Sequence, residues 1–196
     1  LMEKWLNKYE GHKIIIYTNS RKSCVEIAEE MNETKKNTAL AYHAGMSKKM
    51  REIIQQKFSD GKVNIIVSTI AFGMGIDQIV RCVLIFDASS SIEEYYQQIG
   101  RAGRDGEPAE TLMFYGLQDM VLRQKMIFEG EGNEKHKLLE YKRLEALIGY
   151  CESTACRRLA LLSYFDEKVL NCGNCDNCLQ PPTVEDYSDI AKILIT

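Results

Sequence analysis

Two arginines in a glycine-rich run are well suited to bind an anionic ligand. Residues 97–106 read QQIGRAGRDG, which places Gln97, Arg101 and Arg104 four and then three positions apart, on one face of a helix or helix end. The glycines between them leave space for a large ligand or a second backbone. Arginine donates two parallel hydrogen bonds to phosphate oxygens, whereas lysine offers only a point charge. The run therefore indicates a phosphate site, and a Gly-rich turn with two solvated arginines is the alternative.

A second group of reactive side chains lies near the C-terminal end. The chain has seven cysteines, and the run CGNCDNC at residues 172–178 holds Cys172, Cys175 and Cys178 at two-residue intervals. Each C-x-x-C pair can place two thiolates on one metal ion. In a reducing compartment such a cluster is more typical of a metal site than of disulfides. A structural zinc ion is therefore predicted, with an iron-sulfur cluster or reduced cysteines in a loop as alternatives.

A structural zinc site needs four ligands, so one more residue must contribute. The candidates are Cys151, Cys156 and His136. If the two cysteines share a helix, five residues turn through about 140 degrees, so only one of them can face the ion. Cys156 is predicted as the fourth ligand because it is closer in sequence and because the arginines that follow it offset the charge of four thiolates.

Short apolar segments without polar alternation predict the elements that position these residues. The predicted strands are residues 12–18, 38–44, 63–69, 80–88 and 110–116. The first predicted helix covers residues 2–10, and a second, capped by Asn19 and Ser20, runs to about Met31. A third predicted helix runs from Ser47 to about Phe58. A fourth begins with a capping box of Ser91 and Glu94 and carries both Gln97 and Arg101. Strands that alternate with helices indicate an α/β fold: a parallel sheet with helices on both faces.

Polar residues follow the predicted strands at their carboxyl ends, where parallel sheets bind ligands. They are Asn19, Ser20 and Arg21, then His43 and Gly45, then Ser68 and Thr69, and finally Asp87. We expect these side chains and the two arginines to meet at one edge of the sheet.

From about Leu117 the pattern becomes entirely helical, with predicted helices at residues 117–130, 138–153 and 154–165 and a charged linker at 129–137. The predicted domains are residues 1–128, a small helical zinc-binding subdomain at 129–182, and a segment at 183–196.

The net charge of −3 argues against a generally basic nucleic-acid binder, so any contact with DNA or RNA requires a local patch. No run is long enough to cross a bilayer, which predicts a soluble, intracellular protein without a membrane partner. The first residue, Leu1, and the apolar last residues suggest a fragment.

Several motifs resemble the second RecA-like domain and zinc-binding subdomain of RecQ-family DNA helicases. The matching segments are IIYTNSRKSC (15–24), AYHAGMS (41–47), STIAFGMGID (68–77), YYQQIGRAGRDGEPAE (95–110), YCESTACRRLALLSYF (150–165) and CGNCDNCL (172–179). The resemblance implies an enzyme that couples ATP hydrolysis to 3′ to 5′ movement on DNA and to unwinding, in the nucleus of a eukaryote or the cytoplasm of a bacterium. It also implies that residues 183–196 begin a winged-helix domain.

The resemblance assigns roles to particular residues. Arg104 is the expected arginine finger on the terminal phosphate, with Arg101 and Gln97 assisting, and Asp77 and Gly75 are expected to bind the nucleotide. The residues expected along the DNA strand are Ser20, Arg21, His43, Ser68 and Thr69. Alternatives remain open at three of these positions: Ser20 as a helix cap, His43 as a structural histidine and Asp77 as a turn residue.

The chain contains neither G-x-x-x-x-G-K-[ST] nor an acidic D-E-x-H box, so it has no phosphate loop and no Mg²⁺ ligand of its own. ATP and Mg²⁺ are therefore expected to bind mainly through a first RecA-like domain, and this segment alone is expected to be inactive. Two other functions are compatible with the sequence: a non-catalytic, zinc-stapled module that binds DNA or a protein, and part of an RNA helicase. The intact arginine pair favours the motor, and the cysteine cluster favours DNA, at a junction of single-stranded and duplex DNA.

Overall fold

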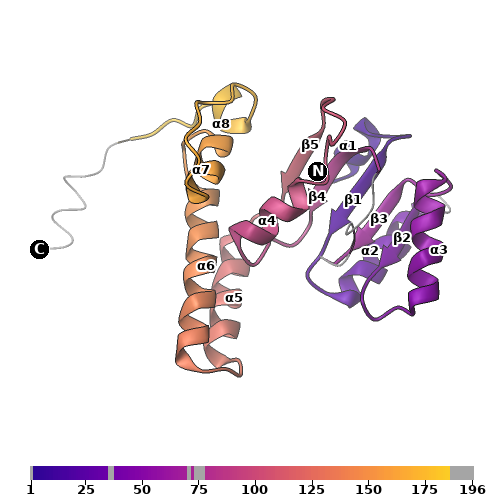
Figure 1. The fold of residues 1–196 in the computed structure, drawn as a ribbon, viewed down its shortest axis with the longest axis horizontal. Helices are drawn as coiled ribbons and strands as arrows, with labels where there is room; N and C mark the ends of the chain where they lie inside the picture. The colour runs from indigo at the N-terminus through magenta and orange to yellow at the C-terminus, as the bar shows by residue number, and fades with distance from the viewer. Residues whose placement is uncertain (1, 35–37, 70–71, 73–77, 186–196) are drawn as a thin grey trace, which may run out of the picture. The chain divides into compact units, whose positions relative to one another are not determined.

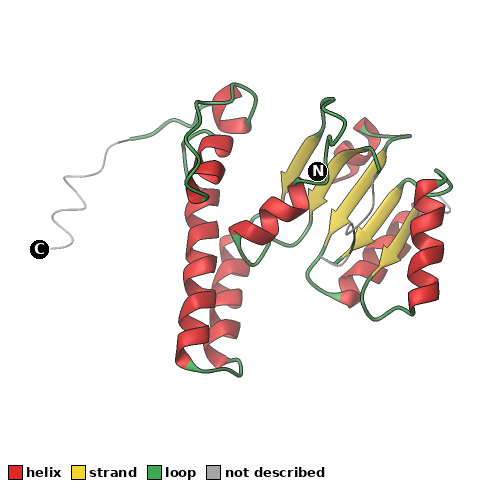
Figure 2. Ribbon diagram, viewed as in Figure 1, coloured by secondary structure: helices red, strands yellow, loops and turns green. Residues whose placement is uncertain are grey.

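The computed structural model describes residues 2–34, 38–69, 72 and 78–185 of the chain (Figures 1 and 2). These residues form two compact units, Leu1–Leu147 and Ile148–Thr196. Among the described residues, no helix has the length and apolar character that crossing a membrane requires.

A five-stranded parallel sheet is the centre of the first unit. Its strands are β1 (Lys13–Tyr17), β2 (Ala39–Tyr42), β3 (Ile65–Ser68), β4 (Val80–Ile85) and β5 (Glu110–Met113), in the order β2-β3-β1-β4-β5 (Figure 1). Every pair of neighbouring strands is parallel, so the predicted α/β fold class is confirmed. Each strand is shorter than its predicted range because the flanking residues enter turns and helix caps.

Helices α1 (Met2–Lys8) and α2 (Arg21–Thr34) cover one face of the sheet. α2 continues three residues beyond the predicted end at Met31. The Cys24 thiol donates to the carbonyl of Val67 at 2.8 Å, which ties α2 to β3. The buried residues of this face are Ile14, Ile16, Cys24, Ile27, Ala28, Met31, Ala39, Val67, Cys82 and Leu84.

The opposite face carries α3 (Lys48–Ser59) and α4 (Ile92–Ile99), so both faces are covered, as predicted. Tyr42, which points away from the first core because side chains alternate along a strand, packs its ring 4.7 Å from that of Phe72. Phe58 of α3 packs 5.7 Å from the same ring. Phe58 and Phe72 are almost completely buried and close this second core.

Hydrogen-bonded caps begin the helices of the sheet. Ser47 caps α3 as predicted, because its side chain accepts from the amide of Met50. Ser91 accepts from the amide of Glu94 in the same way. The predicted capping box differs in one respect: the Glu94 carboxylate accepts from the amide of Ser90 at 2.9 Å, one residue before the cap.

The prediction that one helix carries both Gln97 and Arg101 is wrong. α4 ends at Ile99 and is capped by Gly100, after which short-range bonds from Arg101 to the Gln98 carbonyl and from Ala102 to the Ile99 carbonyl tighten the chain. Gly103 then takes a positive φ of 63°. The chain therefore leaves the helix before Arg101, and Arg101 and Arg104 lie in turns.

The helical part begins with α5 (Leu117–Glu129) and α6 (Glu134–Glu152). The predicted linker at 129–137 is too long, because α6 already begins at Glu134. The Lys137 ammonium donates to the Phe128 carbonyl at 2.9 Å, and the rings of Phe128 and Tyr141 lie 5.3 Å apart, so the two helices turn back along each other. The second unit adds α7 (Arg157–Tyr164) and α8 (Asp176–Leu179). The boundary at residues 128 and 129 stays a prediction.

Asn32 of α2 holds the start of the edge strand β2. Its carbonyl oxygen accepts from the amides of Thr38 and Ala39 at 3.0 and 3.1 Å, and its amide donates to the Ala39 carbonyl at 2.8 Å. We predict that Asn32→Ala lowers the free energy of unfolding by about 1–3 kcal/mol, because two partly buried amides lose their acceptor. Urea unfolding of the purified chain measures this change.

Glu33→Ala, at the exposed neighbouring position of α2, is the matched control, since it keeps all the hydrogen bonds of Asn32. Its cost should be clearly smaller. Equal losses in the two variants would show that the accepted hydrogen bonds do not stabilise this strand.

Candidate functional site

The residues predicted to bind phosphate lie on and after α4. Gln97 is exposed near the end of the helix, and Arg101 is half-buried in the turn that follows. Both line a small pocket, whose remaining lining residues are Tyr17, Phe72 and Gln98. Because Tyr17 ends β1, this pocket joins the α4 segment to the centre of the sheet.

Tyr17 provides a neutral hydroxyl beside the arginines. Burial raises the pKa of Tyr17 to about 12, although the positive charges of Arg101 and Arg104 and a hydrogen bond with Arg101 oppose the shift. The hydroxyl donates to the carbonyl of Phe72 at 3.3 Å. At neutral pH Tyr17 therefore adds no negative charge that would compete with an anionic ligand for the arginines.

A buried network of polar side chains supports α4 beneath Gln97. Gln98 is only 3% exposed and accepts a hydrogen bond from the Ser89 hydroxyl at 2.8 Å. Its amide donates to the Glu94 carboxylate at 3.1 Å. Sequence reasoning singled out Gln97 and missed Gln98 and Tyr17. Their position at the end of a helix and of a strand was the available signal, but the sequence does not reveal which of two adjacent glutamines is buried.

Arg104 is exposed, and its Nε donates to the Gly100 carbonyl at 3.3 Å. The backbone that carries it lies at the start of β4: the Gly103 amide donates to the Val80 carbonyl at 3.0 Å, and Ala102 forms a parallel bridge with Val80. The expectation that the arginines gather at the carboxyl edge is therefore wrong for their backbone. α4 runs antiparallel to the strands, so the chain leaves this helix near the amino ends of the strands.

The carboxyl edge itself collects polar loops as predicted. The Asn19 amide donates to the Asp87 carboxylate at 2.9 Å, and its side chain donates to the Ala88 carbonyl at 3.0 Å, so the loops after β1 and β4 are joined. A Cβ placed on Gly45 would lie 3.0 Å from Nη1 of Arg21 and 3.2 Å from Nδ1 of His43. Arg21 and His43 therefore converge on Gly45, where a larger side chain would crowd both of them.

The other residues predicted along a DNA strand have different surroundings. Ser20 is exposed, and its hydroxyl oxygen accepts from the Ser23 amide at 3.0 Å, which supports the alternative of a helix cap. Ser68 is fully buried, and its hydroxyl lies 2.8 Å from the Tyr42 carbonyl. Thr69 is half-buried at the end of β3. For Ser68 to contact DNA directly, its hydroxyl would have to give up the hydrogen bond to the Tyr42 carbonyl. Asp77 and Gly75, the predicted nucleotide contacts, lie outside the described residues.

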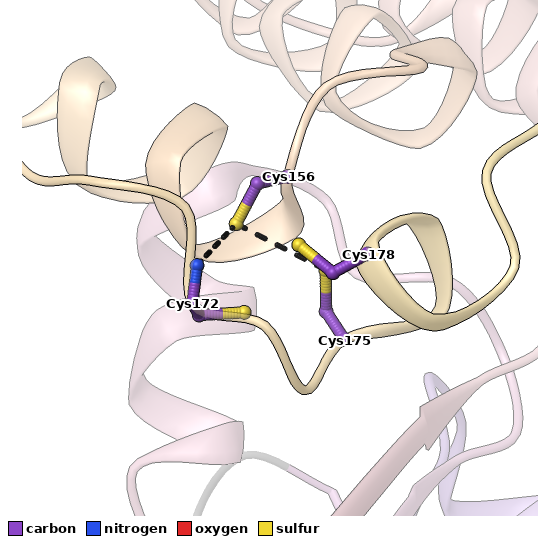
Figure 3. A group of neighbouring side chains, drawn as sticks. All are labelled: Cys156, Cys172, Cys175 and Cys178. Atoms are coloured by element: carbon purple, nitrogen blue, oxygen red, sulfur yellow. Dashed lines mark hydrogen bonds between the residues drawn. The ribbon is translucent and has the colours of Figure 1, made fainter.

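Four cysteines form a compact cluster in the second unit (Figure 3). The Sγ atoms of Cys156, Cys172, Cys175 and Cys178 all lie within 4.8 Å of one another. Cys156 immediately precedes α7, Cys175 precedes α8, and Cys178 lies within α8. Tetrahedral zinc with Zn–S bonds of about 2.3 Å needs sulfur atoms at about this spacing, so the donor set fits the ion.

The electrostatics of the cluster favour the thiolate at Cys156 and Cys175 but not at Cys178. Burial opposes the ionisation of Cys156, but hydrogen bonds from the amides of Cys172 and Leu159 lower its pKa to about 6. Burial likewise opposes ionisation of Cys175, whereas the Arg157 amide, 3.3 Å from its Sγ, helps to lower its pKa. The Gly173 amide lowers the pKa of Cys178, but the neighbouring thiols raise it more, to about 11. Four thiolates therefore need a cation.

Arg157 connects the helices around the cluster. Its Nε lies 3.1 Å from the Asp176 carboxylate, and its Nη1 donates to the carbonyls of Tyr150 and Cys151 at 2.9 Å. These hydrogen bonds show that the Arg157 side chain mainly closes the end of α6.

Cys151, the rival fourth ligand, lies outside the four-cysteine cluster, and burial raises its pKa to about 11. His136, the other candidate, is exposed on α6. The structure therefore brings together the four cysteines that the sequence analysis selected.

Comparisons with known proteins agree with both parts of the site. The family model described as the helicase conserved C-terminal domain matches residues 1–106, and the RecQ zinc-binding model matches residues 117–179. The zinc-binding match and the four-cysteine cluster together support a zinc ion in the second unit.

Two relatives and one solved structure illustrate the similarity. The ATP-dependent DNA helicase RecQ of Haemophilus influenzae is 45% identical over 190 residues, which cover 95% of this chain and 30% of the relative. The ATP-dependent DNA helicase hus2/rqh1 of Schizosaccharomyces pombe is 43% identical over 174 residues, which cover 86% of this chain and 13% of the relative. The E. coli DEAD-box protein SrmB, solved with RraA, matches with a TM-score of 0.55 and 25% identity over 66% of this chain and 76% of the solved one.

This chain thus spans less than a third of the length of these two relatives. Strands β1 to β4, the loop at residues 100–106 that carries the two arginines (the arginine loop) and the four-cysteine cluster nevertheless fall within the two matched segments. The chain belongs to the family described as the helicase conserved C-terminal domain, and its residues 117–179 match the RecQ zinc-binding model.

Proposed function

We propose that this chain is the second motor domain and zinc-binding segment of an ATP-dependent 3′ to 5′ DNA helicase. The single observation that carries the proposal is the α4 segment, where Gln97 and Arg101 line one pocket and Arg104 follows in an exposed turn. Two permanently charged guanidiniums beside a neutral tyrosine suit an anion. The relatives are named ATP-dependent DNA helicases, which supports the phosphates of ATP as this anion.

In this proposal the ATP phosphates and Mg²⁺ are held by a first RecA-like domain, because this chain has no phosphate loop. Arg104 reaches the terminal phosphate and stabilises the charge that develops during phosphoryl transfer. Arg101, held beside Tyr17, supports the same phosphates, and Gln97 senses the nucleotide. Asp77 and Gly75 remain proposed nucleotide contacts.

The DNA strand lies along the carboxyl edge in the proposal. Arg21 and His43 converge at Gly45 and are the strongest phosphate ligands among the described residues of that edge. Ser20 and Thr69 add hydroxyls, and such contacts hold a strand without reading its sequence. An intracellular location, a junction of single-stranded and duplex DNA as substrate, and a first RecA-like domain as partner belong to the same proposal.

The zinc ion has a structural role in the proposal, with Cys156, Cys172, Cys175 and Cys178 as its ligands. The described residues after α7, 165–185, contribute no residue to the buried core, so their order depends on bonds to the ion and on Arg157. Four protein thiolates leave no open position for catalysis.

Arg104→Ala tests the arginine role in a protein that joins this chain to a first RecA-like domain. We predict that kcat for DNA-stimulated ATP hydrolysis falls by about 10³-fold or more, because an arginine finger is worth about 10³–10⁵ in rate. Steady-state ATPase assays at saturating DNA measure this. Arg143→Ala, which removes an exposed arginine of α6, is the matched control and should retain the parent rate. Equal rates for Arg104→Ala and the parent protein would refute the proposed function.

Zinc removal tests the metal site in the chain itself. We predict one zinc ion per chain, released when the thiols are titrated. Loss of a residue that only supports a metal ligand weakens metal binding by about 10–100-fold. Cys156→Ser removes a ligand itself, so it should weaken zinc binding by more than this. Competition with a chromophoric chelator measures the affinity, and thermal unfolding measures the loss of stability. Cys151→Ser is the control and should bind zinc normally; the reverse result would make Cys151 the fourth ligand.

A further inference from the structure

The loop that carries the two arginines is fixed by a residue that lies about twenty positions earlier in the chain. Arg81, the second residue of β4, faces Asp105, the residue that follows Arg104. Nη1 of Arg81 donates to Oδ1 of Asp105 at 2.9 Å, and Nη2 donates to Oδ2, so the pair is bidentate. Nη1 also lies 3.4 Å from the Glu107 carbonyl.

This ion pair is shielded more than an ordinary surface pair. The side chains of Arg81 and Asp105 are 17% and 26% exposed. The hydrogen bond from Arg81 is the largest influence on Asp105 and lowers its pKa, so the carboxylate stays ionised at neutral pH. Because the pKa of Asp105 is lower in the folded protein, the pair stabilises the loop above the ordinary carboxyl pKa and loses this effect as the pH falls through the lowered value.

The loop needs such a connection because it contains two glycines, whose ordering is costly. Gly103 and Gly106, on either side of Arg104 and Asp105, have φ angles of +63° and +81°. Glycine loses more conformational freedom on folding than any other residue, so ordering this loop is costly. The Asp105 carboxylate also accepts from the Glu107 amide at 3.3 Å, which closes the turn between the two glycines.

We infer that Arg81 is a positioning residue that, through its two-pronged ion pair with Asp105, holds the turn of Arg104 against the start of β4. Two consecutive residues of β4 bind the loop: the Val80 carbonyl accepts from the Gly103 amide, and the Arg81 guanidinium donates to the Asp105 carboxylate. Arg81 does not touch the nucleotide; it fixes the backbone from which Arg104 reaches it. The inference rests on the proposed function, because only a role for Arg104 in phosphoryl transfer makes its position matter for rate.

Amide hydrogen exchange in the 196-residue chain tests whether the ion pair orders the loop, independently of ATP hydrolysis. We expect Arg81→Ala to accelerate exchange at Gly103 at least tenfold. Lys8→Ala is the matched control: it removes an ion pair with Glu110 of β5 and should leave exchange at Gly103 unchanged. Unchanged exchange in Arg81→Ala would overturn the inference at this first step.

A double-mutant cycle in the two-domain protein tests whether the ordering acts through Arg104. We expect Arg81→Ala alone to lower kcat by about 10–100-fold, since a displacement of about 1 Å can cost about 10²-fold. In the Arg104→Ala background the same substitution should lower kcat by less than threefold, because there is no longer a finger to place. Arg81→Lys, which keeps one prong of the pair, should give an intermediate rate in the parent background.

The outcomes separate the two ideas. If Arg81→Ala lowers kcat by the same factor in both backgrounds, it acts elsewhere and the positioning role is wrong, while the role of Arg104 stands. If Arg104→Ala itself has the parent rate, the proposed function fails and the positioning role fails with it, whatever the exchange rates show.

Discussion

The parallel pairing of β1 with both β3 and β4 is the constraint on which the site depends. In this register Tyr17 lies level with Ser68 on one side and with Ile85 on the other, so three strands end together. The loops that follow are therefore neighbours, as the bonds from Asn19 to Asp87 and Ala88 show. The same pairing sends α4 back along the sheet, so the arginine loop meets the first residues of β4. One topology thus separates a polar edge from an arginine loop.

Two segments with little hydrophobic core are ordered by the same device, an arginine that binds a carboxylate and backbone carbonyls. Arg81 joins Asp105 and the Glu107 carbonyl to β4, and Arg157 joins Asp176 and the end of α6 to α7. A guanidinium can do this because it presents several donors in one plane and keeps its charge when partly buried. In the second segment the four thiolates of the zinc site add a further connection. Directional bonds replace apolar packing in both places.

The sequence predicted the sheet well because apolar strands and capped helices are local signals. Ser47 begins a helix whatever its surroundings, and the spacing of the last three cysteines is itself a metal signature. What it could not predict depends on tertiary contacts. Arg101 continues a helical pattern in the sequence, but the helix is capped by Gly100, and the Gly103 amide donates to the Val80 carbonyl instead of to a helix carbonyl. Ser68 looked like a strand-end ligand, yet neighbouring β2 buries its hydroxyl. Arg81 and Asp105 lie too far apart in the sequence for a short motif to predict their ion pair.

The two arginines of the loop differ in a way that suits unequal tasks. Arg101 is half-buried beside Tyr17, so its guanidinium is placed before any ligand arrives and little conformational entropy is lost on binding. Arg104 is exposed, so in the proposed function its contribution depends on how firmly its backbone is held. A strongly hydrated, mobile arginine on a mobile loop would gain little at the transition state. In the proposed function, an exposed arginine on a loop fixed by Arg81 combines reach with a defined backbone position, which suits stabilisation of a transition state between two domains.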